Sequence, residues 1–500
     1  MANLLGIDLG TSSVKVLVAD ENGRILSRGS ADYPLLTPKP GRVEQDPHDW
    51  WQAAVMAVRQ AMTGLKGDPS LDGIGISGQM HGAVLLDHTN HILNPAVIWP
   101  DQRSSPQVKE ITDLIGRERL IEITGSPAAT GFQAATLLWF QQNQRDVWRK
   151  TRRVLLPKDY LRWRMTGEFA TDPSDAAGTL LLDGRNRTWS LHLLEQLQIE
   201  SRFMPPIHPS LGEAGKLQLE AAAEMGLFSG TPVVVGAADT ACSLLGAGMT
   251  ASSDLLLTIS TGGQLITPAK SFLFDRRGRL HTFCSALEPD SQQAGWYLMG
   301  ATLSAGQSLR WLRDSIFNMR TAEAYPQMIA WAEQARIGAD GLIFTPYLLG
   351  ERSPLMDSQT RGTFVGLTIR HGRAELVRAV LEGVVYSLYE MYLLLVENGL
   401  QPERVLLAGG GARSRFWMQL VADIFGLPVE KVAVEEQSAY GAALLAGAGI
   451  GLFDVVQGAQ DWAKVDVQAD PNLKAHAQYQ ELQTVFRAVY QNTRHLFGLN

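Results

Sequence analysis

Short apolar runs separated by glycine-rich polar turns recur along the chain. The first two runs, residues 4–9 and 14–20, flank a Gly-Thr-Ser-Ser turn, and a third begins near Gly23. The second run alternates with a period of two, so the opening predicts a meander of three strands rather than a strand-to-helix loop. Apolar positions at helical spacing follow in residues 105–149, 374–397 and 416–425. The pattern predicts a chain of mixed strands and helices.

The opening pattern returns in the second half of the chain. Residues 254–268 again read as a strand, a hydroxyl-and-glycine loop and a second strand. An internal echo of this kind predicts two halves of one architecture that face each other across a cleft. The boundary is expected between Gly246 and Ser253, which gives domains of residues 1–246 and 247–500.

Composition narrows the class of protein. A chain of 500 residues with 45% hydrophobic residues predicts two or three domains with sizeable cores. The net charge of −7 favours neither nucleic acid nor an acidic membrane surface as partner. Two cysteines make no disulfide framework, the first residues lack the features of a signal peptide, and no apolar run reaches the roughly 18 residues of a spanning helix. We expect a cytoplasmic enzyme without nucleic acid or membrane partners.

Asp239 is the strongest catalytic candidate. It follows the apolar strand that begins at Pro232 and a Gly-Ala-Ala turn, and it precedes a helix of small residues. No basic residue lies between Leu217 and Lys270, so the carboxylate has no ion-pair partner nearby in the sequence. A carboxylate at a strand end is a common position for a catalytic group. The alternative is that Asp239 merely caps the helix.

Two glycine-containing loops could hold a nucleotide. The turn at residues 10–13 can offer N–H groups and hydroxyls to a phosphate, and Asp8 before it can hold Mg²⁺ through water. An ordinary hairpin is an equally good interpretation of this turn alone. Gly409, Gly410 and Gly411 lie between a strand and a helix, where a flat group such as adenine with its ribose could rest on the backbone.

Polar residues between apolar runs suggest a sugar pocket. Gln79 and His81 supply donors and acceptors suited to hydroxyl groups, although a core histidine would give the same pattern. Lys158 and Asp159 could be ligand groups or could pair with each other. For Lys158 we favour pairing on a solvated face, since charged residues after a strand are often solvated.

Several motifs together resemble the FGGY family of carbohydrate kinases over about the whole chain. They occupy residues 6–12, 44–47, 78–82, 156–161, 165–170 and 174–179, with a C-terminal signature at 362–367 and 375–382. The resemblance implies an α/β fold of two domains of the actin/hexokinase-type ATPase (ribonuclease H-like) class, facing each other across a catalytic cleft. It places the sugar in residues 1–246 and ATP in residues 247–500.

The resemblance also implies residue roles. Asp239 would be the base that takes the proton of the attacking sugar hydroxyl, and Asp8 would organise Mg²⁺. The sugar pocket would be lined by Gln79, Met80, His81, Asp239 and Thr240. ATP would be held by Thr11, Ser12, Lys15, Thr261, Gly262, Gly306, Gly409, Gly410, Gly411 and Ala412.

The chain departs from the family pattern at three places. The usual Gly-Gly-Asp-Asn reads Ala237-Ala238-Asp239-Thr240, the second phosphate loop reads Ile-Ser-Thr-Gly-Gly, and a usual lysine is Thr136. The first and third changes bear on which sugar is bound.

The implied reaction is ATP-dependent phosphorylation of a ketopentose, with D-xylulose the first candidate. A kinase of another ketose or polyol, such as ribulose or a sugar alcohol, is an alternative, and so is a nucleotide-dependent sugar sensor without turnover. Asp8 and Asp239 together argue against a sensor, because a binding module has no use for a base aimed at the hydroxyl. The residues leave the oligomeric state open between a monomer and a homodimer.

Overall fold

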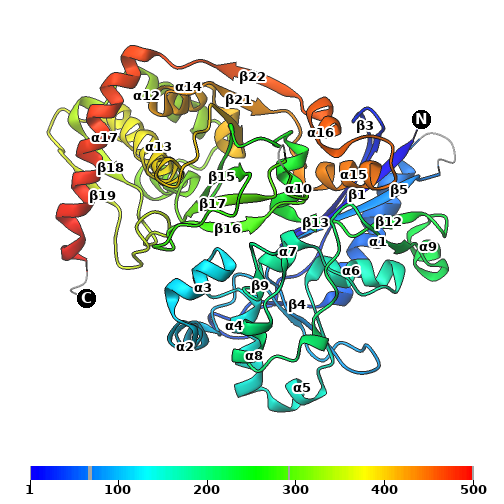
Figure 1. Cartoon of the computed structure of the whole chain (residues 1–500). Helices are drawn as coiled ribbons and strands as arrows, with labels where there is room; N and C mark the ends of the chain where they lie inside the picture. The colour runs from blue at the N-terminus through cyan, green and yellow to red at the C-terminus, as the bar shows by residue number, and fades with distance from the viewer. Residues whose placement is uncertain (1, 66–69, 291–292, 498–500) are drawn as a thin grey trace.

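Two mixed β-sheets form the centre of the protein, as seen in the computed structural model, which describes residues 2–65, 70–290 and 293–497 (Figure 1). The first sheet has the order β11 (Glu213–Lys216), β12 (Pro232–Val234), β5 (Gly73–Gly78), β1 (Asn3–Leu9), β2 (Ser13–Asp20), β3 (Ile25–Asp32), and β13 (Ala237–Ala238) also pairs with β5. The second sheet has the order β16 (His281–Cys284), β17 (Trp296–Thr302), β15 (Gly263–Ala269), β14 (Asp254–Ile259), β20 (Arg404–Ala408), β21 (Val429–Val432), β22 (Val465–Ala469).

The two sheets share one strand pattern. In the first, β1, β2 and β3 are antiparallel neighbours, while β5 and β12 continue parallel to β1. In the second, β14, β15 and β17 are antiparallel neighbours, while β20 and β21 continue parallel to β14. The predicted meander and its echo are therefore confirmed.

Helices and three two-stranded sheets surround the first sheet in the described part of the chain. Its helices are α1 (Pro47–Thr63), α2 (Ser105–Ile115), α3 (Arg117–Thr124), α4 (Gln133–Asn143), α5 (Arg145–Lys150), α6 (Pro157–Thr166), α7 (Pro173–Ala177), α8 (Leu191–Gln196), α9 (Leu219–Met225), α10 (Asp239–Gly246) and the short turn η1 (Ser201–Phe203). Its two-stranded sheets are β4 (Glu44–Gln45) with β7 (Ala96–Val97), β6 (Val84–Leu86) with β8 (Arg153–Leu155), and β9 (Leu182–Asp183) with β10 (Thr188–Trp189). The start of α1 follows prediction, because Asp46 accepts a hydrogen bond from the His48 N–H at 2.9 Å and Pro47 opens the first turn.

The second half of the chain adds a further set of helices. They are α11 (Gly306–Trp311), α12 (Ala324–Gln334), α13 (Arg373–Glu397), α14 (Arg415–Phe425), α15 (Gln437–Gly449), α16 (Val455–Trp462), α17 (Leu473–Thr493) and the short η2 (Leu312–Ile316), η3 (Ala339–Gly341), η4 (Gly410–Arg413) and η5 (Arg494–Leu496). A hairpin of β18 (Ile343–Thr345) and β19 (Thr363–Val365) lies beside them. By length and composition α13 could cross a membrane, but 78% of its most apolar window is buried inside the protein, as in a core helix.

Helix α15 connects the two halves. It comes late in the chain yet lies on β1 and β5 of the first sheet and beside α10 (Figure 1). Glycines allow this approach, since a Cβ on Gly6 would lie 1.9 Å from the Ala439 carbonyl oxygen and one on Gly441 1.9 Å from that of Cys242. The packing therefore carries a segment of the second half back across the predicted boundary near residue 246.

Candidate active site

Asp8 and Asp239 meet at one edge of the first sheet. Strands β1, β5 and β13 are parallel, and Ser77 of β5 lies opposite Asp8 on one side and Ala237 on the other. Asp239 comes two residues after Ala237 and is the first residue of α10. The carboxyl ends of parallel strands form one edge, which is where open sheets bind their ligands. The fold thus brings together two carboxylates that are far apart in the sequence.

Burial raises the pKa of both carboxyl groups and so disfavours their ionised forms. It raises the pKa of Asp8 to about 7, with the charge of Asp239 adding to the rise and the Ser77 hydroxyl, 3.3 Å from Asp8 Oδ1, opposing it. Burial also raises the pKa of Asp239 to about 6, against the hydrogen bonds from Thr240. A carboxylate such as Asp8, whose ionisation is opposed by burial and by a second carboxylate, favours a cation beside it. The site is therefore suited to a positively charged group.

Asp239 is not the N-cap of α10. The N-cap position belongs to Ala238, and the Oδ1 atom of Asp239 accepts hydrogen bonds from the Thr240 N–H at 2.6 Å and the Thr240 hydroxyl at 3.1 Å. Asp239 and Thr240 are partly exposed to solvent. The simple capping alternative therefore does not describe the geometry of this residue.

His81 presents one ring nitrogen as an acceptor. It follows β5 in the left-handed region, with φ of 74°. Its Nδ1 donates to the Gly178 carbonyl oxygen at 2.6 Å, so Nδ1 carries the proton and Nε2 is left as an acceptor. Burial, with Arg352 nearby, lowers the pKa of His81 to about 4, which keeps the ring neutral. The ring packs on Phe132 at 4.6 Å between centroids. A neutral acceptor of this kind suits a sugar hydroxyl.

The second sheet supplies a wall that sequence reasoning missed. The buried hydroxyl of Tyr297, on β17, lies 3.9 Å from the Met80 sulfur. Phe283, on β16, lies 6.1 Å from His81 between ring centroids, and His281 lies 5.8 Å from Phe132. In the sequence these residues belong to ordinary core-like strands, and no motif marks them.

Gln79 is buried close to the loop at residues 10–13. Its side chain is 1% exposed, and its Nε2 donates to Gln45 Oε1 at 2.9 Å. Gln45 in turn donates to the Thr11 carbonyl oxygen at 2.7 Å, and the Thr11 hydroxyl accepts from Trp99 Nε1 at 3.0 Å. The structure therefore gives Gln79 and Thr11 partners within the protein, and both support the loop at residues 10–13.

Two cavities gather most of the predicted nucleotide-binding residues. The cavity of about 410 Å³ joins the two halves of the chain and is lined by Asp8, Lys15, Gly409, Gly410 and Ala412. The cavity of about 860 Å³ is lined by Thr261, Gly306, Gly410 and Gly411, with apolar walls from Tyr325, Ile329 and Phe416. Apolar walls beside glycine backbone suit a flat base, and the carboxylate with lysine suits its phosphates.

Glycine is required where the nucleotide loops touch. A Cβ on Gly409, whose φ is +80°, would lie 2.6 Å from the Ile259 carbonyl oxygen, and one on Gly306 would lie 2.4 Å from that of Ser260. Gly262 lies against β17, where its Cβ would be 2.6 Å from the Thr302 carbonyl oxygen. Ser12 is exposed at the tip of its turn. Gly409 and Gly306 therefore let these loops approach the end of β14 closely.

Comparisons with known proteins find relatives in both sequence and structure. Sequence models of the N-terminal and C-terminal domains of the FGGY family of carbohydrate kinases match residues 3–246 and 268–450. A xylulose kinase from Staphylococcus epidermidis is 36% identical over 99% of this chain and 97% of its own length. A gluconokinase from Bacillus subtilis is 30% identical over 97% of this chain and 94% of its own length. The crystal structure of a ligand-bound xylulose kinase from Lactobacillus acidophilus superposes with a TM-score of 0.93 at 28% identity, covering 100% of this chain and 99% of that one.

Proposed function

The chain belongs to the FGGY family of carbohydrate kinases, and from this premise we propose that it transfers the terminal phosphoryl group of ATP to D-xylulose, giving D-xylulose 5-phosphate and ADP. The observation that carries the proposal is the position of Asp239. It lies near Asp8 at the edge where β1, β5 and β13 end, and its carbonyl oxygen accepts a hydrogen bond from Ser438, which lines the cavity with Gly409 and Gly410. A base at that point can reach an acceptor hydroxyl on one side while phosphates approach from the other.

The proposed reaction depends mainly on positioning. Asp239 accepts the proton of the terminal sugar hydroxyl, whose oxygen attacks the γ-phosphorus as ADP leaves. His81 Nε2 accepts a hydrogen bond from another hydroxyl, and Met80 and Tyr297 supply an apolar floor beside it. Backbone N–H groups of the glycine loops hold the phosphates. Orienting the two substrates in this way can supply a large part of the rate acceleration.

The residues present fit Mg²⁺ that arrives with the nucleotide. Mg²⁺ usually takes one or two carboxylates and keeps waters and phosphate oxygens as its other ligands. Asp8 offers a hard oxygen in the cavity, and no group of three or more His, Cys, Asp or Glu side chains gathers as a metal cage in the described part of the chain. When bound, the ion would neutralise charge on the phosphates, and Asp8 would hold it.

The sugar is tested by a coupled assay of ADP release over a panel of D-xylulose, ribulose, gluconate and sugar alcohols. The proposal predicts the highest kcat/KM for D-xylulose. A higher value for another member would reassign the substrate within the family. Sugar-dependent nucleotide binding with no ADP release from any member would instead favour the sensor.

Thr240 is expected to influence which sugar is preferred. It stands where the family usually has asparagine, and its hydroxyl can make fewer directional bonds than an amide. We predict that Thr240→Asn changes the ratio of kcat/KM between the two best sugars by about tenfold, while kcat for the best sugar changes less. The KM for ATP serves as the internal control and should stay constant. An unchanged ranking across the panel would place Thr240 outside the pocket.

We also propose a reducing cytoplasm as the enzyme's location. Cys242 and Cys284 are buried and unpaired, which suits such a compartment. Fractionation of the producing cells, followed by immunodetection, would test this.

A further inference from the structure

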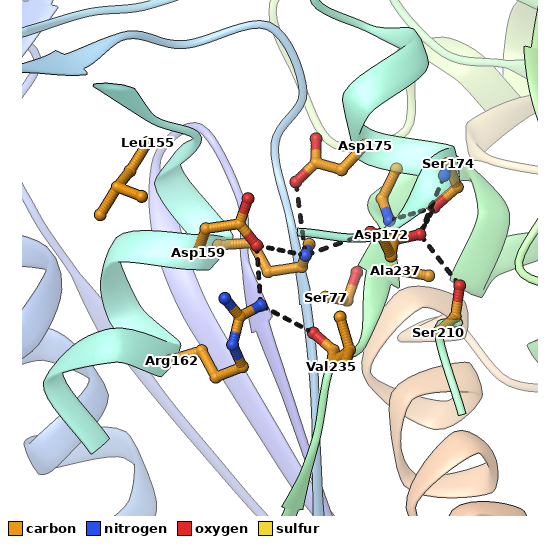
Figure 2. A network of polar contacts seen from close by, with 12 residues as sticks. Ser77, Leu155, Asp159, Arg162, Asp172, Ser174, Asp175, Ser210, Val235 and Ala237 are labelled. Atoms are coloured by element: carbon orange, nitrogen blue, oxygen red, sulfur yellow. Dashed lines mark hydrogen bonds and ion pairs between the residues drawn. The ribbon is translucent and has the colours of Figure 1, made fainter. Parts of the chain in front are cut away.

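A wholly buried network of charged residues lies beneath the turn that presents Asp239 (Figure 2). The ammonium group of Lys158, on α6, lies 2.7 Å from Asp159 Oδ1, 3.2 Å from Asp172 Oδ1 and 3.7 Å from Asp175 Oδ2. All four side chains have no exposed surface. The predicted pairing of Lys158 with Asp159 is confirmed, but the expected solvated face is wrong. The first turn of α6 packs under β5, where a Cβ on Gly78 would lie 3.1 Å from the Lys158 Cβ.

The network sets three carboxyl groups against two basic side chains. Lys158 and Arg162 together outweigh burial and hold the pKa of Asp159 below its ordinary value. Burial, reinforced by Asp159, Asp172 and Asp239, raises the pKa of Asp175 well above its ordinary value. Asp175 is therefore the carboxyl of the network that ionises least readily, while Asp159 is held in its charged form beside Lys158 and Arg162. Removing one partner from such a buried set is costly, so the network is held in a single arrangement.

Two side chains connect the network to the turn before Asp239. Arg162 Nη1 donates to the Val235 carbonyl oxygen at 3.1 Å, as Figure 2 shows. The Ser174 hydroxyl donates to Asp172 Oδ2, and its oxygen accepts a hydrogen bond from the Ala238 N–H at 2.9 Å. Ala238 is the residue immediately before Asp239. An unbroken chain of contacts thus runs from Lys158 through Asp172 and Ser174 to the Ala237–Ala238 peptide, which precedes Asp239.

We propose that Ser174 is a positioning residue for Asp239, and that its hydroxyl, oriented by Asp172, fixes the Ala238 peptide so that the base points at the sugar hydroxyl. The proposal rests on the proposed function, in which Asp239 is the base. The orientation matters because the Ser174 hydroxyl donates its hydrogen bond to Asp172. A lone pair of the Ser174 oxygen is therefore left facing the Ala238 N–H. Small errors in the placement of a catalytic group can cost much of the rate.

Ser210 offers a matched control. Its hydroxyl also donates to Asp172 Oδ2, at 2.9 Å, and its side chain is equally buried. Its hydrogen bond to the turn runs through its backbone carbonyl oxygen, which accepts from the Gly236 N–H at 3.1 Å and which alanine would retain. Ser210→Ala and Ser174→Ala therefore remove the same kind of donor from Asp172, and only the second removes an acceptor from Ala238.

The test compares kcat, both KM values and melting temperature in the two variants. We expect Ser174→Ala to lower kcat by roughly ten- to a hundredfold, with the KM for sugar and for ATP changed by less than about threefold. Ser210→Ala should keep kcat within about twofold, although both variants should melt at lower temperature. If Ser174→Ala does not fold, Ser174→Cys keeps the shape with a weaker acceptor and should lower kcat by a smaller factor.

A double variant separates positioning from general support of the fold. If Ser174 acts through Asp239, then Ser174→Ala should cause no further loss of kcat when added to Asp239→Asn. Equal losses in the two serine variants, or the same loss with and without Asp239, would overturn the proposal. The proposed function is tested separately, by assaying the parent enzyme on the panel of sugars. A wrong substrate can therefore be distinguished from a wrong role for Ser174.

Discussion

The Asp239→Asn variant is expected to turn over at least about a hundred times more slowly than the parent enzyme, because loss of a general base typically costs 10²- to 10⁴-fold in rate. Asparagine keeps the size of the side chain and can still accept from Thr240, but it cannot take up the proton of the sugar hydroxyl. The sugar should bind within several-fold of the parent and ATP should bind normally. The loss should therefore be confined to kcat.

Steady-state ADP release measures the rate, and calorimetric titration of the sugar and of ATP measures binding. Asp87→Asn is a suitable control, since Asp87 orders an exposed turn through Thr89 and His91 and touches no part of the site. Its kcat should match that of the parent. If Asp239→Asn keeps most of its activity while the control behaves as expected, the base is another residue.

The pH dependence should change with the same substitution. Burial raises the pKa of Asp239 to about 6, so in the parent the base is protonated as the pH falls through that value and kcat/KM should decline there. An aspartate with its ordinary pKa would keep the activity down to more acidic solution. Asp239→Asn should lose the part of the decline near pH 6, because no proton can bind at the amide, and should keep the part due to Asp8, whose pKa burial raises to about 7. An acid limb of unchanged steepness would assign the titration to a different group.

Much of the fold was predictable because it is encoded locally. Short apolar runs marked β1, β2, β14 and β15, and the glycine-containing turns between them marked where each pair of strands is joined. The resemblance added the two-domain α/β architecture, which the fit to solved kinases of the family confirms. Asp8 and Asp239 could be identified because each ends a strand, and parallel strands bring such ends to one edge.

The features of the site that the sequence did not predict depend on how segments distant in the sequence pack together. The apolar wall of Tyr297 and Phe283 belongs to the second sheet and reaches Met80 and His81 only after the two halves have come together. The environment of Lys158 depends in the same way on Asp172 and Asp175, which lie in another helix and its cap. Neither contact leaves a periodic signal. From the sequence, a charged residue that follows a strand is predicted to face solvent. The prediction changes only when other segments are known to pack over the helix that carries the residue.

The second large effect is expected at Asp8. Asp8→Ala should lower turnover at saturating Mg-ATP by at least about a hundredfold, because a bound metal ion stabilises phosphoryl transfer by several kcal/mol. Sugar binding should survive, since Asp8 lines the cavity shared with Gly409 and Gly410 rather than the pocket around His81. Asp8→Asn should behave similarly, because an amide keeps the shape but binds Mg²⁺ much more weakly than a carboxylate.

Binding measurements can separate this role from that of Asp239 without relying on activity. In the parent and in Asp239→Asn, Mg²⁺ should strengthen ATP binding, whereas in Asp8→Ala and Asp8→Asn that gain should shrink. The unliganded Asp8→Asn variant should melt no lower than the parent, because the substitution takes a buried carboxylate away from the neighbourhood of Asp239. Full activity of Asp8→Ala at saturating Mg-ATP, or an undiminished effect of Mg²⁺ on its ATP binding, would move the metal to another ligand. A carboxylate that destabilises the empty site and becomes favourable only when a cation is present is what a metal-binding role requires.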